Sequence, residues 1–234
     1  MQIPPTFYPI ELELLQAFNV KQLELTSDFV SHIDDHVETQ TKKIFYQTHA
    51  EDEGEAVEVE VPHIGGISAD EYDFKSIFSE ILPMYQRQSM LVTNWGIFEN
   101  ELKKYYSYLA SKLGKSPSIP RKKNVDGKLE SALQHLVRVF KELGLLTEQS
   151  PLFDAAFTAL DQEVRCVRND WVHNGGVPKN TKNLEEIQGI SLNGNQMDIS
   201  ADYLENATNH MWTLSSEISS SAIDLVKSNQ WINN

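Results

Sequence analysis

Apolar residues spaced alternately three and four positions apart recur along most of this chain. The longest such stripe follows Pro83 and consists of Leu91, Trp95, Phe98, Leu102, Tyr105, Leu109 and Leu113. Residues at these spacings share one face of an α-helix, and a helix of this kind must bury that face against a neighbour. The pattern therefore predicts a mainly helical bundle.

Three further stripes predict helices of the same bundle. One spans residues 129–143. The next begins at Ser150-Pro151, where serine is a good N-cap and proline suits the first helical position, and ends at Asn174-Gly175-Gly176. The last begins near Ala201. Between the last two, residues 190–199 predict a small β-hairpin on the Asn193-Gly194 turn.

The N-terminal part is less regular. Residues 10–25 form an apolar and acidic run that fits either a helix or a strand. From Thr26 the pattern predicts a helix capped by Thr26 or Ser27, with one face made of Phe29, Val30, Ile33, Val37, Ile44 and Phe45. Residues 51–55 predict a solvated acidic loop. Val57, Val59 and Val61 alternate with glutamates, which predicts a short edge strand, and a second helical stretch is expected from Ser68.

Taken together, these patterns predict an all-α fold: a helical bundle with a small β-hairpin insertion and extra N-terminal helices. We assign residues 1–67 to an N-terminal helical extension with an acidic loop, and residues 68–234 to the helical domain. A chain of 234 residues is long enough to bury a sizeable core in this way.

Composition narrows the setting in which such a protein works. Cys166 is the only cysteine, which excludes an internal disulfide framework and a cysteine-rich metal site, and which fits a reducing, cytoplasmic compartment. No signal peptide and no membrane-spanning stretch are expected. The net charge of -14 disfavours broad nucleic-acid binding and suits a basic partner protein. A narrow active site with local positive charge remains compatible with it.

The segment Arg168-Asn169-Asp170-Trp171-Val172-His173 carries the most compact chemistry in the chain. A histidine can exchange a proton with a ribose hydroxyl near neutral pH, because its ordinary pKa lies there. An arginine can hold a phosphate through its planar fork of donors and stabilise the charge of the transition state. An arginine and a histidine are therefore sufficient, in principle, to cut RNA without a metal. The alternative is structural, since a histidine in the last turn also suits the helix dipole.

Helix geometry complicates a one-sided active site. If Val164, Val167 and Trp171 mark the direction of the core, Arg168 lies at its border and His173 points almost opposite. Either the Asn174-Gly175-Gly176 stop bends the histidine back, or a second subunit covers the polar ridge formed by Arg165, Asn169 and His173. We favour the second subunit. Glu99 holds the equivalent border position on the long helix, so it is expected to meet Arg168, as an ordinary ion pair or as part of the site.

Two histidines elsewhere have the spacing of metal ligands. His32 and His36 are four residues apart. A zincin-type site requires glutamate directly after the first histidine and a third ligand, whereas Ile33 stands there. We therefore expect no metal, and no other cofactor.

The stretch "VRNDWVHNGG" at the end of an amphipathic helix resembles the signature of the HEPN superfamily, in which an arginine and a following polar residue precede a histidine by a few positions. Arg168, Asn169 and His173 match it, and "NWGIFENELKKYYSYLA" resembles the early helix that brings an acidic or polar residue, here Glu99, to the same site. The resemblance extends over about residues 85–227.

The resemblance implies an all-helical domain that forms a homodimer. It also implies a metal-independent endoribonuclease of a toxin–antitoxin or antiviral defence system, leaving a 2′,3′-cyclic phosphate and a 5′-hydroxyl. His173 would be the base toward the 2′-hydroxyl or the acid toward the 5′-oxygen, and Arg168 would bind the scissile phosphate. Asn169 would orient the histidine or the substrate, and Glu99 would position Arg168. RNA is then the substrate, with an antitoxin or other protein as possible partner. The alternative is a catalytically inactive HEPN-like module that binds RNA or protein.

Overall fold

The computed structural model of the chain describes residues 10–46, 55–123, 127–146, 150–179, 184 and 186–227. These residues form two compact units. One is Val20–Gln86, and the other consists of the described residues on either side of it. Helices α1 (Ile10–Ser31) and α3 (Leu82–Lys112) contribute residues to both.

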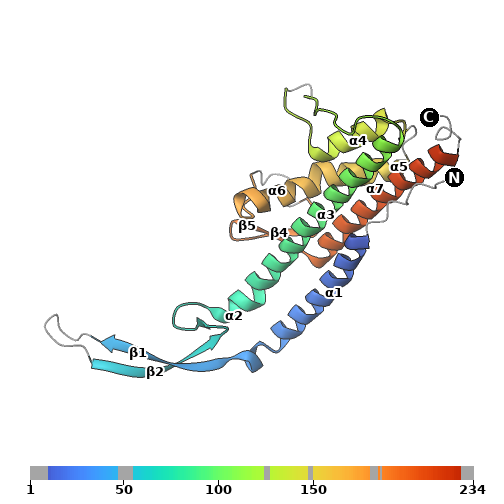
Figure 1. Cartoon of the computed structure of the whole chain (residues 1–234). Coiled ribbons are helices and arrows are strands. Elements are labelled where there is room, and N and C mark those ends of the chain that lie inside the picture. Colours follow the sequence, from blue (N-terminus) through green and yellow to red (C-terminus); the bar gives the residue numbers. More distant parts are fainter. Residues whose placement is uncertain are drawn as a thin grey trace. The chain divides into compact units, whose positions relative to one another are not determined.

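The larger unit is helical and contains the predicted stripes (Figure 1). Besides the parts of α1 and α3, it comprises α4 (Ala132–Glu142), α5 (Pro151–Thr158), α6 (Arg165–Asn174), α7 (Ala201–Lys227) and the hairpin of β4 (Ile190–Asn193) and β5 (Gln196–Ile199). The long stripe of α3 is buried from Leu91 to Leu109, which confirms its predicted core position. Apolar burial of this kind is the main driving force for the bundle.

Local signals in this unit act largely as predicted. The Ser150 hydroxyl accepts a hydrogen bond from the Phe153 N–H, with Pro151 in the first turn of α5. The hairpin is confirmed, although Asn193 pairs with Gln196, so the turn residues are Gly194 and Asn195. Helix α4 begins after Ser131, whose hydroxyl forms a capping box with Gln134.

The helical segment 151–174, which carries Arg168 and His173 and is called the motif helix below, is not a uniform α-helix. Between α5 and α6 the chain forms a π-helix, η3 (Ala159–Val164). A π-turn inserts an extra residue, which here allows both Leu160 and Asp161 to face inward. The Asp161 carboxylate accepts hydrogen bonds from the Ser131 hydroxyl and the Gln134 amide, at 2.7 and 2.6 Å. The π-turn thereby ties the motif helix to the start of α4.

The smaller unit departs most from the sequence-based prediction. Its sheet has the order β1 (Glu38–Tyr46), β2 (Glu55–Ile64), β3 (Ile67–Ser68), all antiparallel. Besides its share of α1 and α3, the unit contains three short helical elements: η1 (Ile33–His36), α2 (Phe74–Ser76) and the π-helix η2 (Ile77–Ile81).

The predicted helix from Thr26 into Phe45 is therefore wrong in its start and in its second half, although residues 26–31 and 33–36 are helical. Thr26 and Ser27 lie inside α1, and residues 38–46 form a strand that pairs along its whole length with β2. The six polar residues 38–43 provide no apolar helical face, whereas the valines of β2 offer a cross-strand partner. The valine segment is a strand as predicted, but it is the middle strand of three. The helical stretch expected from Ser68 begins at Phe74, with Asp73 as its cap. The acidic loop lies outside the described residues, apart from Glu55.

The fold is consequently mostly helical with small antiparallel sheets, an α+β arrangement and not the all-α fold with a small β-hairpin insertion that we predicted. The physical reason is not local. Strand pairing needs a partner segment, and the helical periodicity of one segment does not reveal such a partner. Within the described residues, no helix is long and apolar enough to cross a membrane.

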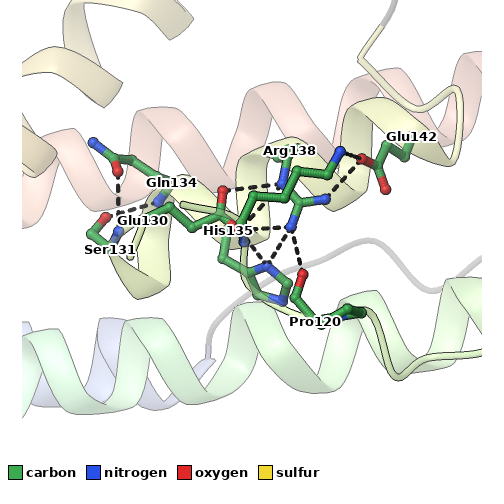
Figure 2. Close-up of polar contacts among 8 residues, drawn as sticks. Pro120, Glu130, Ser131, Gln134, His135, Arg138 and Glu142 are labelled. Atoms are coloured by element: carbon green, nitrogen blue, oxygen red, sulfur yellow. Dashed lines mark hydrogen bonds and ion pairs between the residues drawn. The ribbon is translucent and has the colours of Figure 1, made fainter. Parts of the chain in front are cut away.

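A polar network anchors the loop that leads into α4 (Figure 2). The Glu130 carboxylate accepts hydrogen bonds from the Arg138 guanidinium, the Lys122 backbone N–H and His135, the shortest at 2.6 Å. Arg138 also donates to Glu142 and to the carbonyl of Pro120. Arg138 above all, with Lys122 and His135, lowers the pKa of Glu130 to about 2 against the opposing effect of burial.

Replacing Glu130 with glutamine is expected to lower the free energy of unfolding at pH 7 by about 2 kcal/mol, because Arg138 loses the more buried of its two carboxylate partners and keeps only Glu142. The native pKa of Glu130 lies below its ordinary value. The charge therefore stabilises fully above that ordinary value, and the stabilisation is lost as pH falls toward about 2. Urea unfolding between pH 7 and 3 should show the difference between wild type and Glu130→Gln shrinking in acid. Glu205→Gln, an exposed change in the same unit, should have almost no effect at either pH. A pH-independent difference would contradict the ionic origin.

Candidate functional site

Arg168 lies where the motif helix meets α3. Its guanidinium carbon stands 5.8 Å from the centre of the Trp95 ring, and its Nη1 donates to the Asn169 side chain at 2.8 Å. Its Nε is buried without a hydrogen-bond partner, and within the described residues no carboxylate forms an ion pair with it. The guanidinium therefore packs against an aromatic ring, and Arg168 makes no direct ion pair with a carboxylate among the described residues.

Glu99 is brought to the same place, as its border position on α3 predicted. Its carboxylate accepts from the Trp95 Nε1 at 3.1 Å and pairs with Lys103 at 2.6 Å. Burial opposes the ionisation of Glu99. The hydrogen bond and charge of Lys103, the Trp95 hydrogen bond and the charge of Arg168 outweigh burial and lower its pKa. Glu99 is thus an anion near Arg168, although its direct ion pair is with Lys103.

Trp95 and Lys103 were not singled out from the sequence. Both are four residues from Glu99, so helical spacing alone places them on its face. Trp95 was assigned to the core stripe, and it is indeed buried, with only 2% of its surface exposed. A buried tryptophan can still offer its ring face to a neighbouring cation, which the stripe pattern does not reveal.

Asn169 is half-buried, and its side-chain oxygen is directed to Arg168. The contact brings together two of the predicted site residues. Arg165, the first residue of the predicted polar ridge, has a different role. Its Nε donates to the backbone oxygen and to the carboxylate of Asp161, both at 3.0 Å. Arg165 therefore stabilises the π-turn of its own helix.

His173 is exposed and belongs to the last turn of α6, which continues through Asn174. The helix is thus intact around the histidine and ends only at the Gly175 cap. The first of the two sequence-based alternatives, in which the Asn174-Gly175-Gly176 stop bends the histidine back, does not occur. Residues five apart on an α-helix are separated by about 140° and about 7.5 Å along the axis. Arg168 and His173 of one chain consequently face different directions.

The glycine pair after the motif makes a close turn against Trp171. Gly175 is the left-handed C-cap, with φ of 60°, and Gly176 follows with φ of 83°. The carbonyl oxygen of Gly176 accepts from the Met197 N–H at 2.9 Å, which fastens the helix end to the β4–β5 hairpin. Asp170 supports the turn, accepting from Asn174 at 2.8 Å and from the Lys179 N–H at 3.3 Å.

The histidine pair of the smaller unit makes no metal site in the described part of the chain. His32 is exposed and lies near Ser31 and the carbonyl of Asp28, whereas the His36 ring packs 4.6 Å from the Phe29 ring. No group of three or more metal-ligating side chains gathers anywhere among the described residues.

Comparison with protein-family models, with curated proteins and with solved structures finds no match. The resemblance to HEPN proteins therefore stays a prediction from the sequence motif that contains Arg168, Asn169 and His173.

Proposed function

We propose that this protein is a metal-independent endoribonuclease of HEPN type whose site is completed by a second copy of the chain. One observation supports the proposal above others: Arg168 lies near the Glu99 anion, makes no direct ion pair within the described part of the chain, and is on the same short helix as an exposed histidine. Arg168 is half-buried, and a phosphate would accept hydrogen bonds from its terminal Nη groups rather than from the buried Nε. A histidine is the side chain suited to proton transfer from a hydroxyl.

A second copy resolves the separation of the two groups. In a two-fold symmetric dimer the same surface is used by both copies, so Arg168 of one chain can face His173 of the other, and the reverse. Two composite sites then form from two equal motifs. The exposure of His173 leaves its side chain accessible for such an arrangement.

The reaction follows from the roles of these groups. His173 takes the proton of the ribose 2′-hydroxyl, and the 2′-oxygen attacks the neighbouring phosphorus. Arg168 donates to the non-bridging oxygens and stabilises the charge that builds on them. The bond from phosphorus to the 5′-oxygen breaks, and that oxygen receives a proton from imidazolium. The products are a 2′,3′-cyclic phosphate and a 5′-hydroxyl. Asn169 and Glu99 hold the arginine in place.

The direct test is cleavage of a labelled single-stranded RNA by the purified protein in the presence of a chelator, with analysis of the product ends. We expect cyclic-phosphate and 5′-hydroxyl ends, and inducible expression should degrade cellular RNA and stop growth, as in a toxin of a defence system. If the purified dimer leaves every RNA pool intact, the enzyme proposal fails.

A complementation experiment tests the composite site. Arg168→Ala and His173→Ala proteins should each be inactive, whereas mixing them after reversible dissociation should restore about a quarter of wild-type activity. Random pairing makes half of the dimers mixed, and each mixed dimer has one intact site out of two. An Arg168→Ala, His173→Ala double variant mixed with either single variant is the control and should restore nothing. Mixed dimers that form but stay inactive would overturn the composite site.

One observation favours a second function, a non-catalytic module that binds a basic protein. The net charge of -14 opposes RNA binding at physiological salt and attracts cationic partners. Two measurements separate the two functions. A binding module would leave RNA intact and would keep its partner after His173→Ala, whereas the nuclease would cut RNA and would lose cleavage in that variant.

A further inference from the structure

A cavity of about 360 Å³ lies along the motif helix and is lined by residues of η3 and α6 together with Lys179, Leu184 and Ile187. Its apolar wall includes Val167, Leu184 and Ile187. This volume falls in the range of small-molecule sites, which combine apolar walls with a few placed polar groups. The cavity is therefore large enough for a flat heterocycle.

The polar lining of the cavity combines two carboxylates with amide groups and one cation. Glu163 and Asp170 contribute the carboxylates, Gln162 and Asn169 contribute amides, and Lys179 is the one cation among the lining residues that the structure describes. Asp170 is fixed in orientation, since it accepts from the Asn174 side chain and from the Lys179 N–H. Each carboxylate oxygen can accept more than one hydrogen bond, so a ligand that offers N–H groups can still bind to it.

The position of the cavity connects it with the proposed site. Asn169 lines the cavity and also accepts the hydrogen bond from Arg168 at 2.8 Å. His173 follows Asn169 by four residues, so both lie on one face of α6. A nucleotide whose ribose lies at His173 can therefore place its base along the same face toward the cavity.

We infer that this cavity is a nucleobase subsite that prefers bases bearing an exocyclic amino group; the inference rests on the proposed function. Carboxylates accept hydrogen bonds from the amino groups of cytosine, adenine or guanine, and amide side chains pair with base edges. Uracil has no amino group, and its one donor on this edge, N3–H, lies between two carbonyl oxygens. A carboxylate that accepts from N3–H therefore lies beside a carbonyl oxygen, and this contact between acceptors costs binding energy.

Cys166 gives a test that does not depend on catalysis. It is the only cysteine of the chain, is exposed and lines the cavity. In the His173→Ala protein, saturating AMP, CMP or GMP should slow the reaction of Cys166 with a chromogenic thiol reagent by threefold or more. UMP at the same concentration should protect much less. Equal protection by all four nucleotides, or by none, would overturn the inference.

Cleavage specificity provides the second arm. Wild type should cut oligonucleotides with A, C or G on the 5′ side of the scissile phosphate about tenfold faster than those with U. Glu163→Gln should narrow this ratio, whereas Glu205→Gln should leave it unchanged. Active protein without any base preference would overturn the subsite but not the nuclease. Absence of cleavage together with selective protection of Cys166 would overturn the nuclease and support the subsite.

Discussion

Replacing His173 with alanine is expected to lower the rate of RNA cleavage by on the order of 10³-fold, the usual contribution of a general acid or base. His173 is exposed in the last turn of α6, and no described hydrogen bond within the fold involves it, so its removal should leave stability almost unchanged. The expected signature is a fall in kcat with an unaltered thermal midpoint. Single-turnover cleavage and a thermal scan measure the two quantities.

His32→Ala is the matched control for this variant. His32 is likewise exposed, and it lies in the smaller unit away from the motif in sequence. It should cut RNA at the wild-type rate. A His173→Ala protein that keeps cleavage within tenfold of wild type would remove histidine from the mechanism, and an equal loss in both variants would indicate general damage.

Arg168→Lys is informative beside them, because lysine keeps the charge but loses the planar fork. If Arg168 holds the phosphate through paired donors while its plane rests on Trp95, lysine should restore only a small part of the activity lost in Arg168→Ala. Full rescue by lysine would mean that charge alone matters at this position.

The helical stripes were predictable because burial repeats with the helix period. Leu91, Phe98 and Leu109 on α3 all proved buried, as their spacing required. The same spacing located Glu99 near Arg168, since both occupied the border of a buried stripe. Ser150, Pro151 and Gly175 set the ends of the motif helix through short-range chemistry that a single segment contains.

Other features depended on partners that a local pattern does not contain. Strand β1 exists because β2 pairs with it, and residues 38–43 alone have no strong preference. The inward turn of Asp161 requires a π-helix, which is stabilised by Ser131 and Gln134 from another helix. The rotation of 100° per residue about the helix axis, which the sequence-based prediction assumed, does not hold across a π-helical segment. The direction of His173 was predicted well because α6 itself is regular.

The glycine turn after the motif is where packing and backbone strain coincide. A Cβ atom added to Gly176 would lie 2.3 Å from the Trp171 side chain, and the backbone there has φ of 83°. Gly175 also has a positive φ, of 60°, but a Cβ atom there meets nothing within 4 Å. The two glycines therefore separate the cost of the left-handed backbone from the cost of a steric clash.

Gly176→Ala is expected to lower the free energy of unfolding by about 3 kcal/mol, the sum of about 1 kcal/mol for the left-handed backbone and about 2 kcal/mol for overpacking. Gly175→Ala should cost only the first part. Urea unfolding followed by tryptophan fluorescence measures the loss of stability in both variants, because unfolding changes the surroundings of Trp171. Since the carbonyl of Gly176 also holds Met197 of the hairpin, Gly176→Ala should loosen β5 from the helix end. Equal losses for the two variants would mean that Trp171 yields freely, and that the close contact with Gly176 does not fix the end of the motif helix.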